Sequence, residues 1–268
     1  MLAINQQTRL NFRIDHDEAP ITLLFFNGAT LPLEFWDPVI QRLGQLNCVR
    51  FDQRNAGRTE FEGSFSLNDV AADAAQLLKH LDHKEVIVVG HAWGGRAAQV
   101  FARDYPHLTR ALIICGTGGQ LPPRTNPETL KEMATARRQG NRQQWEDALH
   151  KTFCARNFRD NHPHEFEATA TTIWNAPIPR GAKWDTRISP SLSYWGTCDK
   201  PVLLLYGTED KNGTRENAED LHDRLSDSRL HYIDDTGHFV VREAPDAVVN
   251  LICAFLGELS AQKPTTRK

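Results

Sequence analysis

Apolar and polar residues along this chain form two alternating patterns, short apolar runs and amphipathic segments of helical period. The apolar or alternating runs predict strands over residues 9–14, 21–26, 48–52, 85–90, 108–116, 201–207 and 230–234. Side chains at helical spacing predict helices over residues 34–44, 66–82, 96–106, 214–225 and 244–259. Because strands and helices alternate, the pattern predicts an α/β fold with a mainly parallel sheet and right-handed crossovers.

Two local signals refine this prediction. The polar stretch HDEAP separates the first two apolar runs, which favours a hairpin strand followed by a buried strand. Ser66 precedes an amphipathic segment and is followed three residues later by Asp69, so the helix over 66–82 is predicted to begin with Ser66 as its N-cap.

The alternation of strand and helix patterns stops between residues 116 and 200. This stretch is rich in Arg, Gln, Asn, Pro and Trp, shows helical segments near 127–138, 142–154 and 163–174, and carries no strand signal. We therefore expect residues 1–115 and 201–268 to form one α/β core, with residues 116–200 inserted as an all-helical cap over the strand ends.

Composition narrows the functional classes. The formal charge of −3 over 268 residues, without long runs of one sign, argues against partners such as nucleic acid or an anionic membrane. Residues 1–15 lack an apolar signal core, and no apolar stretch approaches the roughly 18 residues of a membrane span. We expect a cytoplasmic monomer or weak homodimer whose partner is a small molecule.

The five cysteines, Cys48, Cys115, Cys154, Cys198 and Cys253, are scattered and form no CxxC pair, which indicates reduced core cysteines rather than disulfides or metal ligands. The only glycine cluster that could suggest a phosphate site, GTGG at 116–119, lacks the strand–loop–helix context that such a site requires. The sequence therefore predicts no metal, nucleotide, flavin or other cofactor.

The stretch EVIVVGHAWGGRAAQ at 85–99 carries the strongest chemical signal. A strand runs into a glycine-flanked turn and then into a helix, which is the pattern G-x-S-x-G of a nucleophile elbow. Gly90 and Gly94 occupy the glycine positions. The nucleophile position is held by Ala92, which has no hydroxyl, thiol or carboxylate, so we expect this chain to be nearly inert there.

Two further segments follow in a fixed order. LLLYGTED places an acid after one strand, and DDTGHF places His238 after the next strand. This order of nucleophile, acid and base, together with the elbow, resembles the α/β-hydrolase fold over nearly the whole chain. The resemblance implies a triad in which Asp210 orients His238 and His238 activates the group at position 92. Glu209 is the alternative acid, and the family pattern G-x-x-D favours Asp210.

The same resemblance implies an oxyanion site made of two backbone N–H groups. Trp93 supplies one by following the nucleophile position, and Ala29 supplies the other after the strand that ends in FFNG. Many relatives have His-Gly where this chain has Asn27-Gly28, so the surroundings of the oxyanion differ here.

The substrate is suggested by two weaker signals. RFDQRNAGRTEF at 50–61 resembles a loop of anthracycline methylesterases and serine-dependent macrolide esterases, although Asp52, Arg54, Gly57 and Arg58 could equally tie this loop to the sheet. Aromatic residues over the active face favour a bulky, partly apolar ester or lactone. The predicted substrate-binding residues are Phe35, Trp36, Trp145, Trp174, Trp184 and Trp195. Glu165, Glu167 or Asp185 could meet the amino sugar of a macrolide.

Three explanations of Ala92 remain open. The first is a serine esterase or lactonase whose nucleophile has been replaced by engineering, because Asp210 and His238 are both present. The second is replacement of a nucleophilic aspartate, since GHDWGG is an elbow of dehalogenases and epoxide hydrolases, although residues 116–190 lack the cap tyrosines that an epoxide hydrolase requires. The third is a natural binding protein that has kept the pocket without the nucleophile.

Overall fold

A seven-stranded sheet forms the centre of the computed structural model, which describes residues 1–16, 19–54, 56–119, 121–122, 124–177, 181–184 and 192–261. The strand order is β12-β11-β9-β8-β4-β5-β3, and all neighbours are parallel except β3, which runs antiparallel at one edge. The strands are β3 (Phe12–Asp15), β4 (Thr22–Phe26), β5 (Asn47–Phe51), β8 (Val86–His91), β9 (Thr109–Cys115), β11 (Val202–Gly207) and β12 (Ser228–Ile233).

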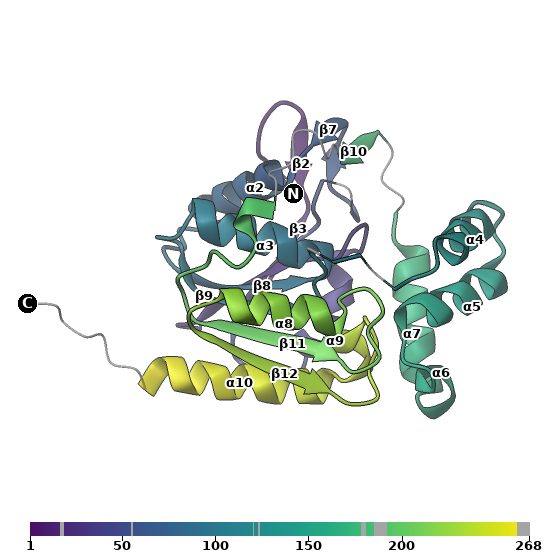
Figure 1. Ribbon diagram of the computed structural model, residues 1–268. Coiled ribbons are helices and arrows are strands. Elements are labelled where there is room, and N and C mark those ends of the chain that lie inside the picture. Colours follow the sequence, from purple (N-terminus) through teal and green to yellow (C-terminus); the bar gives the residue numbers. More distant parts are fainter. Residues whose placement is uncertain are drawn as a thin grey trace, which may run out of the picture.

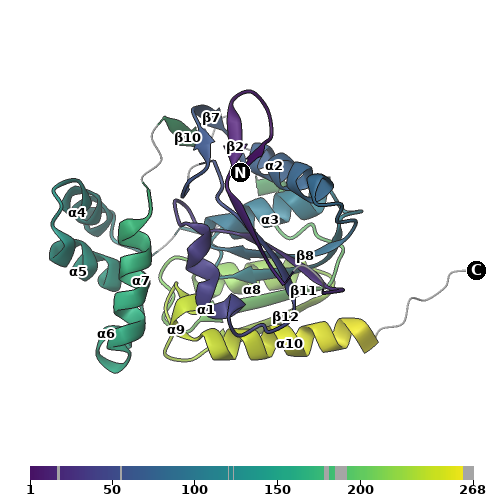
Figure 2. The same ribbon diagram turned by 180° about the vertical axis from the view of Figure 1, so that it is seen from behind.

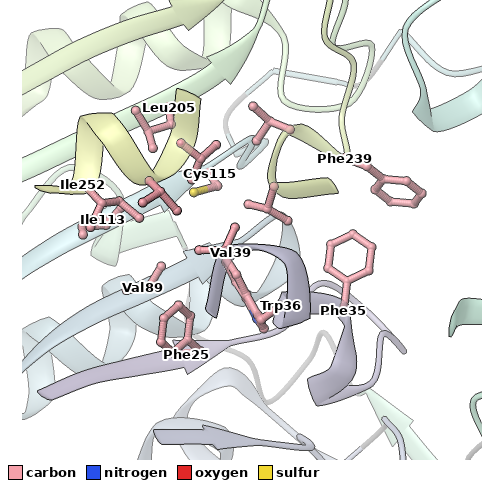
Figure 3. Close-up of a cluster of buried hydrophobic side chains, with 14 of the residues drawn as sticks. Phe25, Phe35, Trp36, Val39, Val89, Ile113, Cys115, Leu205, Phe239 and Ile252 are labelled. Atoms are coloured by element: carbon pink, nitrogen blue, oxygen red, sulfur yellow. The ribbon is translucent and has the colours of Figure 1, made fainter. Parts of the chain in front are cut away.

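The central strands are apolar along their whole length because helices cover both faces of the sheet. Every residue of β8 is buried, and successive side chains point to opposite faces. Ile87 and Val89 pack in one core cluster, whereas Val86 and Val88 pack in the other. Figure 3 shows the first cluster, where Val89 lies among side chains of the sheet and of the C-terminal helix.

The helices form two layers (Figures 1 and 2). One core cluster receives side chains from α2 (Leu67–His80), α3 (Trp93–Asp104) and α8 (Arg215–Arg224). The other receives them from η1 (Leu33–Trp36), α1 (Asp37–Ile40), α9 (Val240–Glu243) and α10 (Pro245–Ala261). The Ser66 side chain accepts the Asp69 N–H at the start of α2, and the Asp69 carboxylate accepts the Ser66 N–H, which confirms the predicted cap.

Four helices lie together beyond the carboxyl ends of the central strands, and we refer to them as the cap. They are α4 (Pro127–Arg138), α5 (Arg142–Phe153), α6 (Phe158–Asn161) and α7 (Pro163–Asn175). In Figure 1 the arrowheads of β11 and β12 point toward this group. Helix α7 packs on η1 and α9 of the core, and the end of α5 meets the core at Phe239, whose ring stacks on that of Phe153 at 5.1 Å between centroids.

Two expectations differ from the structure. The first two apolar runs do not form a hairpin, because both edges of β4 are occupied by the parallel strands β5 and β8, and β3 pairs with β5 instead. The region between 116 and 200 is not all-helical, since β10 (Ala182–Trp184) pairs in parallel with β7 (Gly63–Phe65). A small antiparallel sheet of β1 (Leu2–Ala3), β2 (Thr8–Leu10) and β6 (Glu60–Phe61) was also unpredicted.

Candidate active site

The turn between β8 and α3 keeps the shape of a nucleophile elbow around Ala92. The backbone of Ala92 has φ 52° and ψ −120°, a conformation that is uncommon for a residue with a side chain. The turn is so tight that a Cβ at Gly94 would lie 2.2 Å from the Asn27 carbonyl oxygen, and a Cβ at Gly90 would lie 2.6 Å from the Gly95 Cα. Glycine is therefore required at both flanking positions, and Ala92, between them, lines the cavity.

Asp210 and His238 meet at the edge of the sheet beside this turn. The Nδ1 atom of His238 lies 3.0 Å from each carboxylate oxygen of Asp210. The Oδ1 atom of Asp210 also accepts the N–H groups of Asn212 (2.7 Å) and Gly213 (2.9 Å), which fix the carboxylate. Because a carboxylate only accepts, Nδ1 carries the proton and Nε2 is the basic nitrogen of the ring.

Glu209, the alternative acid, is directed elsewhere. Its Oε2 atom accepts the backbone N–H of Arg156 at 2.9 Å, and Asp210 is the acid that contacts His238. Neighbouring acids in the sequence thus differ in what they contact, because the backbone after β11 turns one side chain toward the sheet edge and the other toward the segment after α5.

Contacts from three directions hold the loop that carries His238. The His238 N–H donates to the Phe153 carbonyl at 2.7 Å, and the His238 carbonyl accepts from the ring Nε2 of His91 at 2.8 Å. The carboxylate of Glu243 accepts the N–H groups on either side, from Gly237 at 3.0 Å and Phe239 at 3.1 Å. The loop is therefore tied to the cap, to the elbow strand and to α9.

Glu243 and His91 have perturbed pKa values for the same physical reason. Burial raises the pKa of Glu243 to about 7, although the backbone N–H groups of Ala155, Gly237 and Phe239 lower it. Burial also lowers the pKa of His91 to about 3, so His91 stays neutral. Sequence reasoning missed Glu243 because no local pattern shows that three N–H donors converge on its side chain.

The expected oxyanion residues both border the same space. Trp93 is the first residue of α3, Ala29 follows the end of β4, and both line the cavity next to Ala92. The Asn27 side chain is fully buried and donates to the Phe51 carbonyl at 3.0 Å. It also accepts from Trp36 Nε1 at 3.0 Å, so its role in the structure is to anchor the end of β4.

A cavity of about 480 Å³ connects the elbow with the cap. This volume falls within the range of about 300–1,000 Å³ that is typical of small-molecule sites. The side chains from the core lie at one end, and α4, α5 and α7 close the other. The lining residues include Ala29, Ala92, Trp93, Arg96, His238 and Phe239 from the core and Met133, Arg137, Trp145, Leu149, Phe153 and Ile173 from the cap.

Of the five predicted substrate-binding aromatics whose side chains the structure describes, Trp145 alone lines this cavity. Phe35 and Trp36 are fully buried in the core instead, and Figure 3 shows Phe35 facing Phe239, at 5.1 Å between ring centroids. Trp174 packs behind Trp145, at 5.2 Å between ring centroids. These predictions are corrected because helical spacing alone cannot distinguish a core-facing side chain from a cavity-facing one.

The last two predicted aromatics lie after the cap helices. Trp195 packs in the core cluster of α3 and α8, and its Nε1 donates to the Asp220 carboxylate at 2.7 Å, so it also lies outside the cavity lining. The side chain of Trp184 lies outside the described part of the structure.

The loop at 50–61 connects parts of the core. Asp52 accepts the backbone N–H of Leu33 at 2.7 Å and that of Arg58 at 2.8 Å, and Arg54 makes a bidentate ion pair with Asp73 at 2.7 and 2.9 Å. A Cβ at Gly57 would lie 2.1 Å from the Asp52 carboxylate, which explains the glycine. None of these residues lines the cavity, which favours the structural interpretation of the loop.

Two of the three acidic residues considered for an amino sugar lie outside the cavity lining. Glu165 and Glu167 are exposed on α7, and Glu167 pairs with Arg142 at 2.5 Å. Asp185 lies outside the described residues.

Comparison with known proteins defines the class of this protein. Residues 21–245 match the family described as the alpha/beta hydrolase fold, so the chain belongs to the α/β-hydrolase family. It is 28% identical over 248 residues to a poly(3-hydroxyalkanoate) depolymerase of Ectopseudomonas oleovorans, covering 87% of this chain and 83% of the relative. It is 22% identical to epoxide hydrolase 1 of Caenorhabditis elegans, covering 94% of this chain and 69% of the relative.

A solved structure shares the fold. A thermophilic esterase from Thermogutta terrifontis, with malate bound, superposes with a TM-score of 0.78 at 24% identity and covers 93% of each chain. Within the described residues, no helix combines the length and the apolar character needed to cross a membrane. The fold and the relatives together place this chain among the hydrolases of the α/β-hydrolase type.

Proposed function

We propose that this chain carries the machinery of a carboxylic ester or lactone hydrolase of the Ser-His-Asp type, with alanine in place of the nucleophilic serine at position 92. The observation that supports this most directly is the buried Asp210–His238 pair beside an elbow that presents Ala92 to a cavity. Maintaining this arrangement has a cost, because Ala92 adopts a positive φ and Asp210 is withdrawn from water.

With a hydroxyl at position 92, the residues present would perform acyl transfer in two steps. The Nε2 atom of His238 accepts the hydroxyl proton while the oxygen bonds to the substrate carbonyl carbon, and the N–H groups of Ala29 and Trp93 stabilise the oxyanion. The proton then passes from Nε2 to the departing alcohol as its C–O bond breaks. Water then attacks the acyl carbon while Nε2 takes its proton, and Nε2 returns this proton to the oxygen at position 92 as the acyl group leaves. Asp210 keeps the other proton on Nδ1 throughout.

As given, the chain should bind substrate without turning it over. Ala92 has a methyl group where serine would have a hydroxymethyl group, whereas the cavity wall, His238 and Asp210 are all present. Loss of the nucleophile lowers turnover by orders of magnitude while binding contacts remain, because binding and bond formation use different groups.

A second candidate is an aspartate nucleophile at position 92, as in dehalogenases and epoxide hydrolases. The relative named epoxide hydrolase 1 favours it. The cap opposes it, because residues 116–190 contain no tyrosine to activate an epoxide oxygen, and Tyr194 is buried in the core cluster beside α3. The relative named poly(3-hydroxyalkanoate) depolymerase supports an ester bond as the target. A natural binding protein is the third candidate.

The size of the cavity limits the substrate. At about 480 Å³ it lies in the lower half of the usual range, so it suits a medium-sized ester or lactone better than a complete macrolide. The resemblance to anthracycline and macrolide esterases therefore stays a prediction, as do the cytoplasmic location and the oligomeric state.

The experiment is to compare Ala92→Ser and Ala92→Asp with the chain as given, on p-nitrophenyl esters, lactones, haloalkanes and epoxides. We expect Ala92→Ser alone to hydrolyse esters or lactones. Turnover of haloalkanes or epoxides by Ala92→Asp, with Ala92→Ser inactive, would establish the aspartate candidate instead. Inactivity of both variants, with saturable ligand binding by the chain as given, would favour a binding protein.

A further inference from the structure

The wall of the cavity carries positive charge without a negative partner. Arg96 reaches it from α3 and Arg137 from the last turn of α4, and among the described residues that line it there is no aspartate or glutamate. The remainder of the wall is largely apolar, with Trp145, Leu149 and Ile173 on the cap side. Cationic side chains in such surroundings are costly unless an anion compensates them.

Arg137 is fixed in position with part of its guanidinium unused. Its Nη2 atom donates to the carbonyls of Trp174 at 3.1 Å and Ala176 at 3.0 Å. Its Cζ lies 5.8 Å from the ring centroid of Trp145 and 5.9 Å from that of Trp174, near the limit of a cation–π contact. Burial lowers the pKa of Arg137, and no acidic neighbour opposes this shift.

Three buried arginines of this chain differ from the half-buried Arg137 in the partners of their guanidinium groups. Arg50 and Arg54 are paired with carboxylates from the core. Arg242, which has no ion pair within the described residues, uses all three nitrogens: Nε donates to Thr169, Nη1 to the carbonyls of Glu34 and Phe35, and Nη2 to Thr172. In contrast, Nε and Nη1 of Arg137 make no hydrogen bond within the described residues, and Arg137 borders the cavity.

Arg96 contributes a second positive charge near the elbow. It lies one helical turn after Ala92, and its Nε donates to the Gly118 carbonyl at 2.8 Å. The two arginines therefore give the cavity a positive potential that extends from the elbow to the cap, strengthened by its apolar wall.

We propose that the substrate of this site carries a carboxylate, which pairs with Arg137 at the cap end of the cavity while the reacting carbonyl lies at position 92. This inference rests on the proposed function and narrows its substrate class to half-esters of dicarboxylic acids or lactones with a free carboxyl group. The unused Nε–H and Nη1–H groups of Arg137 lie on different edges of the guanidinium, and each can donate a charge-assisted hydrogen bond to a carboxylate oxygen. The apolar wall between the two ends fits a hydrocarbon spacer.

The test compares mono-p-nitrophenyl esters of dicarboxylic acids of graded length with the same esters methylated at the far carboxyl group. In Ala92→Ser, kcat/KM should be about tenfold or more higher for the free acid at one chain length, because a charge-assisted pair replaces an uncompensated charge. Arg137→Gln should remove most of this preference. Arg137→Lys should keep part of it, which separates loss of charge from loosening of the cap.

Arg138→Gln is the matched control, since Arg138 is the next residue of α4, is exposed and donates a hydrogen bond to the Thr135 hydroxyl on its own helix. It should leave the preference unchanged. If Ala92→Ser with Arg137→Gln prefers the free acid as strongly as Ala92→Ser alone, the role of Arg137 is overturned. If Ala92→Ser has equal kcat/KM for the free acid and its methyl ester, the anionic substrate is overturned while the esterase proposal stands.

A binding measurement separates failure of the inference from failure of the proposed function. Monomethyl and dimethyl esters of the same diacids are titrated into the chain as given, by calorimetry. Tighter binding of the monomethyl ester, lost in Arg137→Gln, supports the inference even if Ala92→Ser is inactive. No binding of the monomethyl esters, or equal binding of both series, would overturn it.

Discussion

Substituting Gly94 with alanine tests whether the close contact between the elbow helix and β4 positions the oxyanion donors. The added Cβ would lie 2.2 Å from the Asn27 carbonyl oxygen and 2.4 Å from that of Phe26. Both are backbone atoms, so no side-chain rotation can relieve the contact. The start of α3 and the end of β4 must separate.

The size of this shift follows from the geometry. Ordinary van der Waals contact begins near 3.4 Å, so the two segments have to separate by about 1 Å. Overpacking of this kind costs roughly 1–3 kcal/mol of folding free energy. Because Ala29 follows β4 and Trp93 begins α3, the same shift moves the two N–H groups apart. A displacement of about 1 Å in an active site lowers turnover by roughly a hundredfold.

The assay is kcat for ester hydrolysis in Ala92→Ser with and without Gly94→Ala, together with urea unfolding of both proteins. Gly257→Ala is the control, because Gly257 is exposed in α10 and a Cβ there meets nothing within 4 Å. We expect the control to gain up to about 1 kcal/mol of stability and to keep full turnover. If Gly94→Ala retains kcat within threefold, the proposed oxyanion site is wrong.

Three further predictions concern stability and the base. The pKa of Glu243 in the folded protein, about 7, lies above its ordinary 4.5, so the folding stability linked to this carboxyl is fully present below pH 4.5 and is lost as pH rises through 7. Between pH 4.5 and 7, urea unfolding should show the free energy of unfolding of the chain falling by roughly 3 kcal/mol relative to that of Glu243→Gln. A difference between the two proteins that does not change with pH would refute this. Asp210→Asn in Ala92→Ser should lower kcat by about 10³–10⁴-fold through loss of the Nδ1–H acceptor, and an unchanged kcat would argue against Asp210 as the orienting acid. Arg54→Met should lower the free energy of unfolding by about 3–5 kcal/mol, because it leaves buried Asp73 unpaired. In the Ala92→Ser background it should leave the preference among esters unchanged. A changed preference would show that the loop at 50–61 takes part in substrate recognition.

Local patterns in the sequence predicted the elements well. The predicted helix over 127–138 coincides with α4, and Ser66 caps α2, because capping and amphipathic period depend on neighbours in the chain. The hairpin was wrong because the partner of β3 is chosen by the whole sheet: β5, some thirty-five residues later in sequence, takes the place next to it.

The sequence predicted the site residues that follow the ends of strands, but it did not predict which aromatic side chains line the cavity. Asp210 and His238 each follow a parallel strand, and parallel strands end at one edge of the sheet, so their proximity follows from their order. Trp36 and Trp145 are both tryptophans in segments of helical period. Trp36 donates a hydrogen bond to Asn27 in the core, whereas Trp145 lines the cavity. Only tertiary packing separates these two outcomes.

The most direct test of the account is the intact mass of Ala92→Ser after brief reaction with a p-nitrophenyl ester and acid quenching. The account predicts a mass increase equal to one acyl group, located at residue 92 by peptide mapping. The chain as given should show no adduct, and adding His238→Gln to Ala92→Ser should slow its formation by orders of magnitude. Ester hydrolysis by Ala92→Ser with the acyl group on another residue, or undiminished after His238→Gln, would contradict the proposal that position 92 holds the nucleophile of a Ser-His-Asp site.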